Sequence, residues 1–60
     1  MTIAAQIALL ASHIAECIEM MEAAYMNFNL SEPEVMEEVA YYQGVVAELR
    51  DRKGALEVWA

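Results

Sequence analysis

The chain has few of the side chains that usually stabilise or activate a small protein. It contains one cysteine, one histidine, one proline and two glycines among 60 residues. A single cysteine excludes an internal disulfide, and a single histidine leaves few ligands for a structural metal. A chain of this length buries only about 60% of the surface that its unfolded form exposes. Self-association is the remaining way to complete its core.

Basic residues are also scarce: three Lys and Arg oppose ten Asp and Glu, which gives a formal net charge of −7. Nucleic-acid binding and docking on anionic lipid both need a basic surface, so this composition argues against both. Residues 1–15 carry no charged side chain. They lack the basic start of a signal peptide, however, and Gln6, Ser12 and His13 interrupt the apolar run. We therefore expect neither a signal peptide nor a membrane span. The lone thiol favours a reducing compartment, the cytoplasm.

Apolar side chains are abundant and make up 60% of the chain. In the first half they recur at alternating spacings of four and three residues, which is typical of the seam of a helical bundle or coiled coil. This seam comprises Ile3, Ile7, Leu10, Ile14, Cys17, Met21, Ala24 and Phe28. A flanking row widens the apolar face with Ala4, Ala8, Ala11, Ala15, Ile18 and Tyr25. The pattern predicts a helix over about residues 2–27.

The stretch NLSEPEVMEEV, residues 29–39, ends the first pattern and begins a second. Ser31 and Glu34 have the spacing of a capping box, and Leu30 and Val35 that of a hydrophobic staple. Pro33 falls in the first helical turn, where its missing N–H costs little. The second seam comprises Val35, Val39, Tyr42, Val46, Leu49, Lys53 and Leu56. We predict a turn over residues 28–31 and a helix over about residues 32–58.

Two glycines leave the course of the second helix open. Gly44 lowers the stability of a helix by about 1 kcal/mol relative to alanine. Either a close helix crossing requires a glycine there, or the position is simply exposed to solvent. Gly54 follows a basic run and suits a helix end, yet Leu56 keeps the seam in register beyond it, so we favour the longer helix. Two long helices and a short turn predict an all-α, antiparallel two-helix hairpin. A symmetric dimer forming a four-helix bundle would cover its seam, in an orientation that the sequence leaves open.

Two sets of residues follow as candidate interaction sites. The predicted dimer core consists of the large residues on the seam: Ile3, Ile7, Leu10, Ile14, Cys17, Met21, Phe28, Val35, Val39, Tyr42, Val46, Leu49 and Leu56. Seven of the ten acidic residues lie between positions 16 and 38, where no Lys or Arg occurs. This asymmetry predicts a contact surface for a basic protein. The predicted partner-binding residues are six of these carboxylates and three apolar side chains off the seam: Glu19, Glu22, Glu32, Glu34, Glu37, Glu38, Leu9, Met20 and Tyr41.

Residue arrangements typical of catalysis or metal binding are not evident. Cys17 lies on the seam with no base beside it, which is typical of a buried structural thiol. His13, Glu16, Glu19 and Glu22 recur every third residue, but their order is the reverse of the Glu-x-x-His of di-iron bundles. Trp59 could cap the dimer edge or anchor a partner. We expect no enzymatic activity, cofactor or metal.

The segment from about Ile14 to Leu49 resembles the small helical-hairpin aspartyl-phosphate phosphatases that act on sporulation response regulators. The resemblance lies in a Met- and Ile-rich first helix and in NLSEPEVMEE at the start of the second. It implies a hairpin fold and protein partners. The Ser-Gln-Glu-Leu-Asp signature of that family would align with Val39, Ala40, Tyr41, Tyr42 and Gln43. None of these residues matches, so no site residue is carried over. At the level of fold the hairpin also resembles small plasmid copy-number dimers that bind RNA, a function that its acidity opposes.

These observations predict a small acidic, dimeric, helical protein–protein interaction module in the cytoplasm. It would regulate or inhibit a partner protein by covering a basic surface on that partner. A response-regulator aspartyl-phosphate phosphatase and a plain structural dimerisation unit are the alternative functions.

Overall fold

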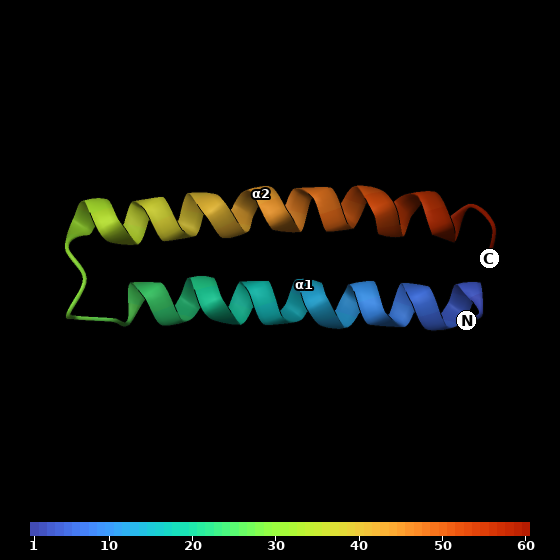
Figure 1. Ribbon diagram of the computed structural model, residues 1–60, viewed down its shortest axis with the longest axis horizontal. Helices are drawn as coiled ribbons and strands as arrows, with labels where there is room; N and C mark the ends of the chain where they lie inside the picture. Colours follow the sequence, from blue (N-terminus) through green and yellow to red (C-terminus); the bar gives the residue numbers. More distant parts are fainter.

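Two antiparallel helices make up the structure, and they lie side by side with both chain termini at one end (Figure 1). The computed structural model describes all of residues 1–60. Helix α1 spans Ile3–Tyr25 and helix α2 spans Glu32–Glu57. The hairpin measures 43 × 14 × 12 Å and contains no strand. The predicted all-α antiparallel hairpin is confirmed.

Side chains next to the helix ends explain where α1 begins and ends. The Thr2 hydroxyl accepts a hydrogen bond from the Ala5 N–H at 3.0 Å, which is an N-cap that our sequence analysis missed. At the other end the Met26 N–H donates to the Glu22 carbonyl at 3.1 Å. The Asn27 side chain then accepts a hydrogen bond from the Asn29 N–H at 3.0 Å and holds the chain in a turn. Helix α1 therefore ends two residues before the predicted position 27.

Phe28 is the clearest departure from the predicted seam. Its position continues the spacing of four and three residues, but the helix has already ended when the chain reaches it. Without helical phase the side chain no longer points toward α2, and it is 93% exposed. Ile3, at the opposite end of the seam, is 38% exposed because it lies in the first turn of α1. Neither residue belongs to the core of the hairpin.

The predicted capping box is present at the start of α2. The Glu34 N–H donates to the Ser31 hydroxyl at 3.4 Å, and the Ser31 N–H donates to the Glu34 carboxylate at 3.1 Å. Pro33 lies in the first turn. The helix continues through Gly54 to Glu57, so the longer of the two predicted ends is the observed one. A Cβ atom added at Gly44 or Gly54 would meet nothing within 4 Å, so no close helix crossing inside the hairpin requires either glycine.

The seam residues pack between α1 and α2 of a single chain. Ile14, Cys17, Val46 and Leu49 form the central cluster. Ala24 and Val39 are buried nearer the turn. All the other residues predicted for a dimer core, except Ile3 and Phe28, are half-buried along the same interface: Ile7, Leu10, Met21, Val35, Tyr42 and Leu56. The predicted seam is therefore the core of the hairpin itself, and its role as the core of a dimer stays a prediction.

Two helices cover little of each other. Only six of the 60 residues are buried, and none of them is polar or charged. Large apolar side chains remain exposed along both helices, including Leu9, Met20 and Tyr41, and Trp59 is exposed after the end of α2. A core of this size stabilises a small domain only marginally. The hairpin therefore leaves much of its apolar surface exposed.

Ile14→Asp tests the central cluster. Ile14 is 9% exposed and contacts the apolar groups of α2, so an aspartate there would be desolvated without a partner. We expect a loss of at least about 3 kcal/mol, which is enough to abolish the helical circular dichroism signal of a marginal domain. Ser12→Asp, on the exposed side of the same helix, is the matched control and should cost about 1 kcal/mol or less. Equal helicity in the two variants would contradict the assignment of the core.

Candidate functional site

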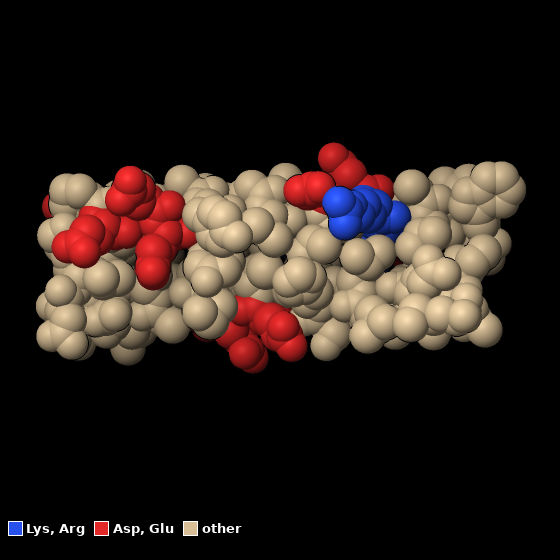
Figure 2. All heavy atoms as spheres, viewed as in Figure 1, with Lys and Arg blue, Asp and Glu red and all other residues tan.

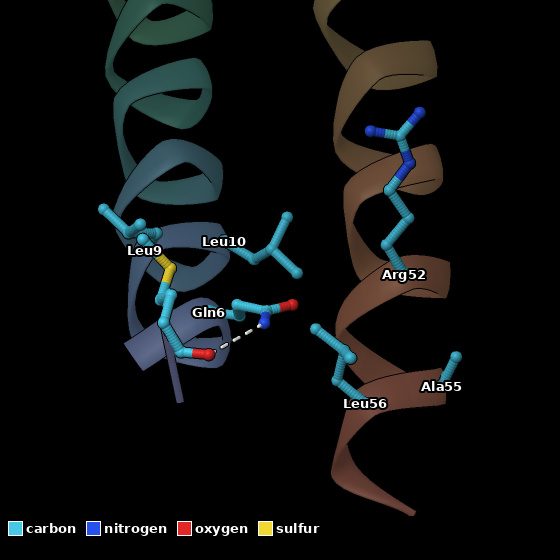
Figure 3. Close-up of a pocket in the computed structure, with 7 residues that line it drawn as sticks. Gln6, Leu9, Leu10, Arg52, Ala55 and Leu56 are labelled. Atoms are coloured by element: carbon cyan, nitrogen blue, oxygen red, sulfur yellow. Dashed lines mark hydrogen bonds between the residues drawn. The ribbon is translucent and has the colours of Figure 1, made fainter. Parts of the chain in front are cut away.

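A shallow apolar pocket of about 500 Å³ opens between the helices near the chain termini. Figure 3 shows Gln6, Leu9 and Leu10 of α1 opposite Arg52, Ala55 and Leu56 of α2. Met1 completes the lining, and its carbonyl accepts a hydrogen bond from the Gln6 side chain at 3.5 Å. Only Arg52 contributes a charge to this lining. The pocket therefore suits an apolar side chain of a partner better than a polar metabolite.

The pocket identifies which rows of side chains share one side of the hairpin. Residues seven apart along a helix with a continuous seam stay on the same side of that seam. Gln6 and Leu9 of α1 share the pocket with Arg52 and Ala55 of α2, so the rows that contain them flank the same side. We call this side the pocket face; its residues are Gln6, Leu9, His13, Glu16, Met20 and Ala23 on α1, and Glu34, Glu38, Tyr41, Val45, Glu48, Arg52 and Ala55 on α2.

Half of the residues in the rows on the other side of the seam are alanine or glycine. We call this side the alanine face; its residues are Ala4, Ala8, Ala11, Ala15, Ile18, Glu22 and Tyr25 on α1, and Met36, Ala40, Gln43, Ala47, Arg50, Gly54 and Glu57 on α2. Small side chains let another helix approach closely. The alanine face is therefore smooth along the first half of α1, whereas Tyr25 and Met36, near the turn, are 60% and 56% exposed on the same face.

The three apolar residues predicted to bind a partner lie on the same face. Leu9, Met20 and Tyr41 all belong to the pocket face and are 56%, 49% and 66% exposed. The Tyr41 ring packs edge-on against Tyr42, with ring centroids 5.1 Å apart, which fixes its direction. An exposed, oriented aromatic ring beside aliphatic groups is typical of an anchor residue in protein interfaces.

The six carboxylates predicted to bind a partner are all exposed, but they do not form one patch. Glu34 and Glu38 lie on the pocket face, Glu22 lies on the alanine face, and Glu32 lies in the first turn of α2. Glu19 and Glu37 occupy the outer sides of their helices, away from the seam. Figure 2 shows acidic groups gathered over the beginning of α2 at the turn end of the hairpin. The carboxylates in the first turns of α2 and Glu19 and Glu22 of α1 are therefore spread over the half of the hairpin near the turn. We call this half the acidic half.

The opposite half of the hairpin is close to electrically neutral. Arg52 donates to the Glu48 carboxylate at 2.7 Å, and the Lys53 ammonium lies 3.3 Å from the Glu57 carboxylate. Both pairs are four residues apart on an exposed helix surface, where such pairs contribute a few tenths of a kcal/mol. Arg50 takes part in no ion pair. The three basic residues balance the three acids after position 40, so the uncompensated negative charge lies between residues 16 and 38.

Glu34 is the carboxylate that the local structure perturbs most clearly. The Ser31 hydroxyl donates to its Oε1 at 2.8 Å, and the Ser31 N–H donates to the same atom. These hydrogen bonds favour the ionised form and lower the pKa of Glu34 below its ordinary value of 4.5. Glu34 therefore stabilises the start of α2, which limits its freedom to contact a partner.

Cys17 and two of the positions aligned with the phosphatase signature lie in the seam between the helices. No group of three or more His, Cys, Asp or Glu side chains is placed to hold a metal ion. Cys17 is 4% exposed, and its thiol is enclosed in the apolar cluster. Among the positions aligned with the phosphatase signature, Val39 is buried and Tyr42 is half-buried in the seam. Val39 and Tyr42 contribute to the core of the hairpin, whereas the other three aligned positions, Ala40, Tyr41 and Gln43, are exposed.

By length and composition alone, α1 could cross a membrane, with a mean hydropathy of 1.4 over its most apolar stretch. A mostly buried helix of a soluble protein and a signal sequence near the N-terminus meet the same criterion, and only 6% of this stretch is buried in the hairpin. In the hairpin the seam of α1 packs against α2, which carries ten charged residues between Glu32 and Glu57. The absence of a membrane span and the cytoplasmic location remain predictions.

No family model, curated protein or solved structure matches the chain significantly. A function is therefore inferred from the two faces of the hairpin. Neither the pocket nor the division of the surface into two faces was predicted from the sequence. Leu9 and Leu10 were the available signal, since adjacent leucines place one side chain in the seam and the other beside it.

The pH dependence of stability tests the capping box. The lowered pKa of Glu34 means that its ionised form stabilises the folded state at neutral pH. This contribution is complete above the ordinary value of 4.5 and is lost as the pH falls through the lowered pKa. The free energies of unfolding in urea of the wild type and of Glu34→Gln, measured at a fixed protein concentration, should differ at neutral pH and become equal in acid.

Ser31→Ala is the comparison variant for this measurement, because the Ser31 hydroxyl is the main cause of the lowered pKa. Replacing Glu34 in a Ser31→Ala background should change the pH dependence much less than in the wild type. If Glu34→Gln changed the pH dependence of stability equally in both backgrounds, the hydrogen bond from Ser31 would not be the cause of the lowered pKa.

Proposed function

We propose that this hairpin is a small acidic interaction module that self-associates and binds a basic surface of a partner protein, thereby regulating or inhibiting that partner. The observation that carries the proposal is the exposure of Leu9, Met20 and Tyr41 on a face that also bears Glu34 and Glu38. Apolar anchors beside uncompensated carboxylates suit a protein surface that offers both apolar and basic groups.

Electrostatics would contribute mainly to the rate and selectivity of binding. The acidic half attracts a basic partner over distances set by the Debye length, about 8–10 Å at physiological salt. The apolar groups of the pocket face would then provide the lasting contacts. We therefore expect the affinity for the partner to fall as the salt concentration rises. Part of the affinity should persist at high salt, because salt does not screen the apolar contacts.

Binding rather than catalysis is supported by the shape of the hairpin and by the environment of its only thiol. The pocket is shallow and largely apolar, and the buried Cys17 has no base beside it. Inhibition would follow from covering a basic site on the partner, which needs no reactive group on this chain.

Charge neutralisation of the acidic half tests the proposal. The test variant carries Glu32→Gln, Glu37→Gln and Glu38→Gln, which leave the capping box intact. The matched control carries Glu48→Gln, Asp51→Asn and Glu57→Gln, which remove the same number of carboxylates from the opposite half. Tagged forms of both and of the wild type are incubated with native-host lysate after nuclease treatment, and bound proteins are identified by mass spectrometry.

We expect a basic protein that the wild type and the control retain and that the test variant loses. For the purified pair, raised salt should weaken binding to the wild type strongly and to the test variant only slightly. Equal loss of the bound protein in both variants would show that net charge, rather than the acidic half, governs the capture. Binding unaffected by either variant or by salt would contradict the electrostatic part of the proposal.

A further inference from the structure

We infer that two copies of the hairpin pack antiparallel through their alanine faces, with α1 of one copy lying against α1 of the other and α2 against α2. The inference rests on the self-association in the proposed function and specifies its surface and orientation. It leaves both pocket faces on the outside of the dimer, free to bind a partner.

Side-chain volume along α1 favours this arrangement. The first half of the alanine face on α1 carries four alanines, from Ala4 to Ala15, and the second half carries Ile18, Glu22 and Tyr25. Reversing a second copy about a point between Ala15 and Ile18 places each large residue opposite a small one. Ile18 then lies on Ala15 of the second copy, and Tyr25 lies on its Ala8. Alternation of large and small groups across an interface is what allows close packing.

The parallel alternative packs poorly. The central cluster joins Ile14 and Cys17 with Val46 and Leu49, so it sets which residues of the two helices lie at the same height. A parallel face-to-face dimer would stack α1 on α2 at equal heights, with Ala8 near Gly54 and Ala15 near Ala47. Small groups would then face small groups in one half and leave gaps there, which forfeits contacts on both sides.

The distribution of charge favours the same orientation. A parallel dimer would bring together two acidic halves, each with seven carboxylates and no basic residue. The antiparallel dimer instead places the acidic half of each copy against the nearly neutral half of the other. It also brings Arg50, which has no ion pair within its own chain, close to Gln43 of the second copy. Like charges repel, so self-association is easier in the antiparallel arrangement.

Charge also distinguishes the two faces. The pocket face carries four carboxylates and one guanidinium, whereas the alanine face carries two carboxylates and one guanidinium. Packing two pocket faces together would therefore desolvate more unpaired negative charge. On α2 the same reversal places Ala40 near Gly54 of the second copy, so only α1 alternates large and small residues across the interface. Glu22 belongs to this interface and would not be available to a basic partner.

The size of the alanine face is adequate for a dimer. The hairpin is 43 Å long and 14 Å wide, so one broad face covers about 600 Å². Two such faces bury about 1,200 Å², at the lower end of the range for specific protein interfaces. The two copies bury this full area only if they overlap along their whole length. They do so when the point of reversal lies near the middle of α1.

Sedimentation equilibrium of Ala15→Glu and Ala23→Glu tests which face is used. Both alanines are exposed on α1, one on each face, and the two substitutions have the same effect on charge and helix propensity. The wild type should be a dimer, and Ala15→Glu should raise the dimer dissociation constant about 100-fold or more because it desolvates a carboxylate. Ala23→Glu should change it less than about threefold.

Double electron–electron resonance on Asn29→Cys, spin-labelled at the exposed turn, tests the orientation. Cys17 is 4% exposed and should stay unlabelled under native conditions, which mass spectrometry can verify. With a rise of 1.5 Å per residue and reversal near residues 16–17, the two labels of an antiparallel dimer should lie about 35–40 Å apart. In a parallel dimer they should lie within about 20 Å, given helix separations of about 10 Å.

The possible outcomes separate this inference from the proposed function. A monomeric wild type would overturn both the alanine-face dimer and the self-association on which it rests. A dimer that Ala23→Glu dissociates and Ala15→Glu does not would overturn the choice of face and leave self-association intact. A dimer with label distances below about 20 Å would overturn the orientation alone.

Discussion

Two helices share only one seam, and this constraint governs the rest of the structure. Each helix of the hairpin can bury one stripe of side chains against the other, and here that stripe contains the central cluster of Ile14, Cys17, Val46 and Leu49. The heptad spacing keeps the stripe straight over the length of both helices. Every other apolar residue is left beside the seam or on the outer surface. The exposed hydrophobic groups therefore follow from the architecture, and they motivate the proposed contacts with partners.

The two sides of the seam are suited to different partners. The alanine face is weakly charged and, along α1, smooth in one half and bulky in the other, which would fit a reversed second copy. The pocket face carries Leu9, Met20 and Tyr41 among carboxylates, which fits a protein with apolar and basic groups. A dimer formed through the alanine face would present two pocket faces on opposite sides. The uneven charge along the hairpin connects these features, because it opposes parallel self-association and attracts a basic partner.

Much of the fold could be predicted from the sequence because its signals are local. The seam spacing, Ser31 and Glu34 of the capping box, and Pro33 each act over one or two helical turns. The end of α1 was predicted too late because the Asn27 side chain stabilises a turn that competes with the helix. Phe28 was misplaced for the same reason. The faces were harder to predict, since they depend on which flanks of α1 and α2 meet across the seam. Once the packed hairpin fixes that relation, Leu9, Met20 and Tyr41 fall on one side and Glu22 on the other.

The central claim is that the hairpin completes its apolar burial with a second copy. Thermal unfolding followed by circular dichroism over a hundredfold range of protein concentration tests it most directly. If folding is coupled to dimerisation, mass action requires the Tm to rise steadily with concentration. The account predicts such a rise. A cooperative transition whose Tm is the same at every concentration would show that one hairpin is stable alone, and would contradict the account.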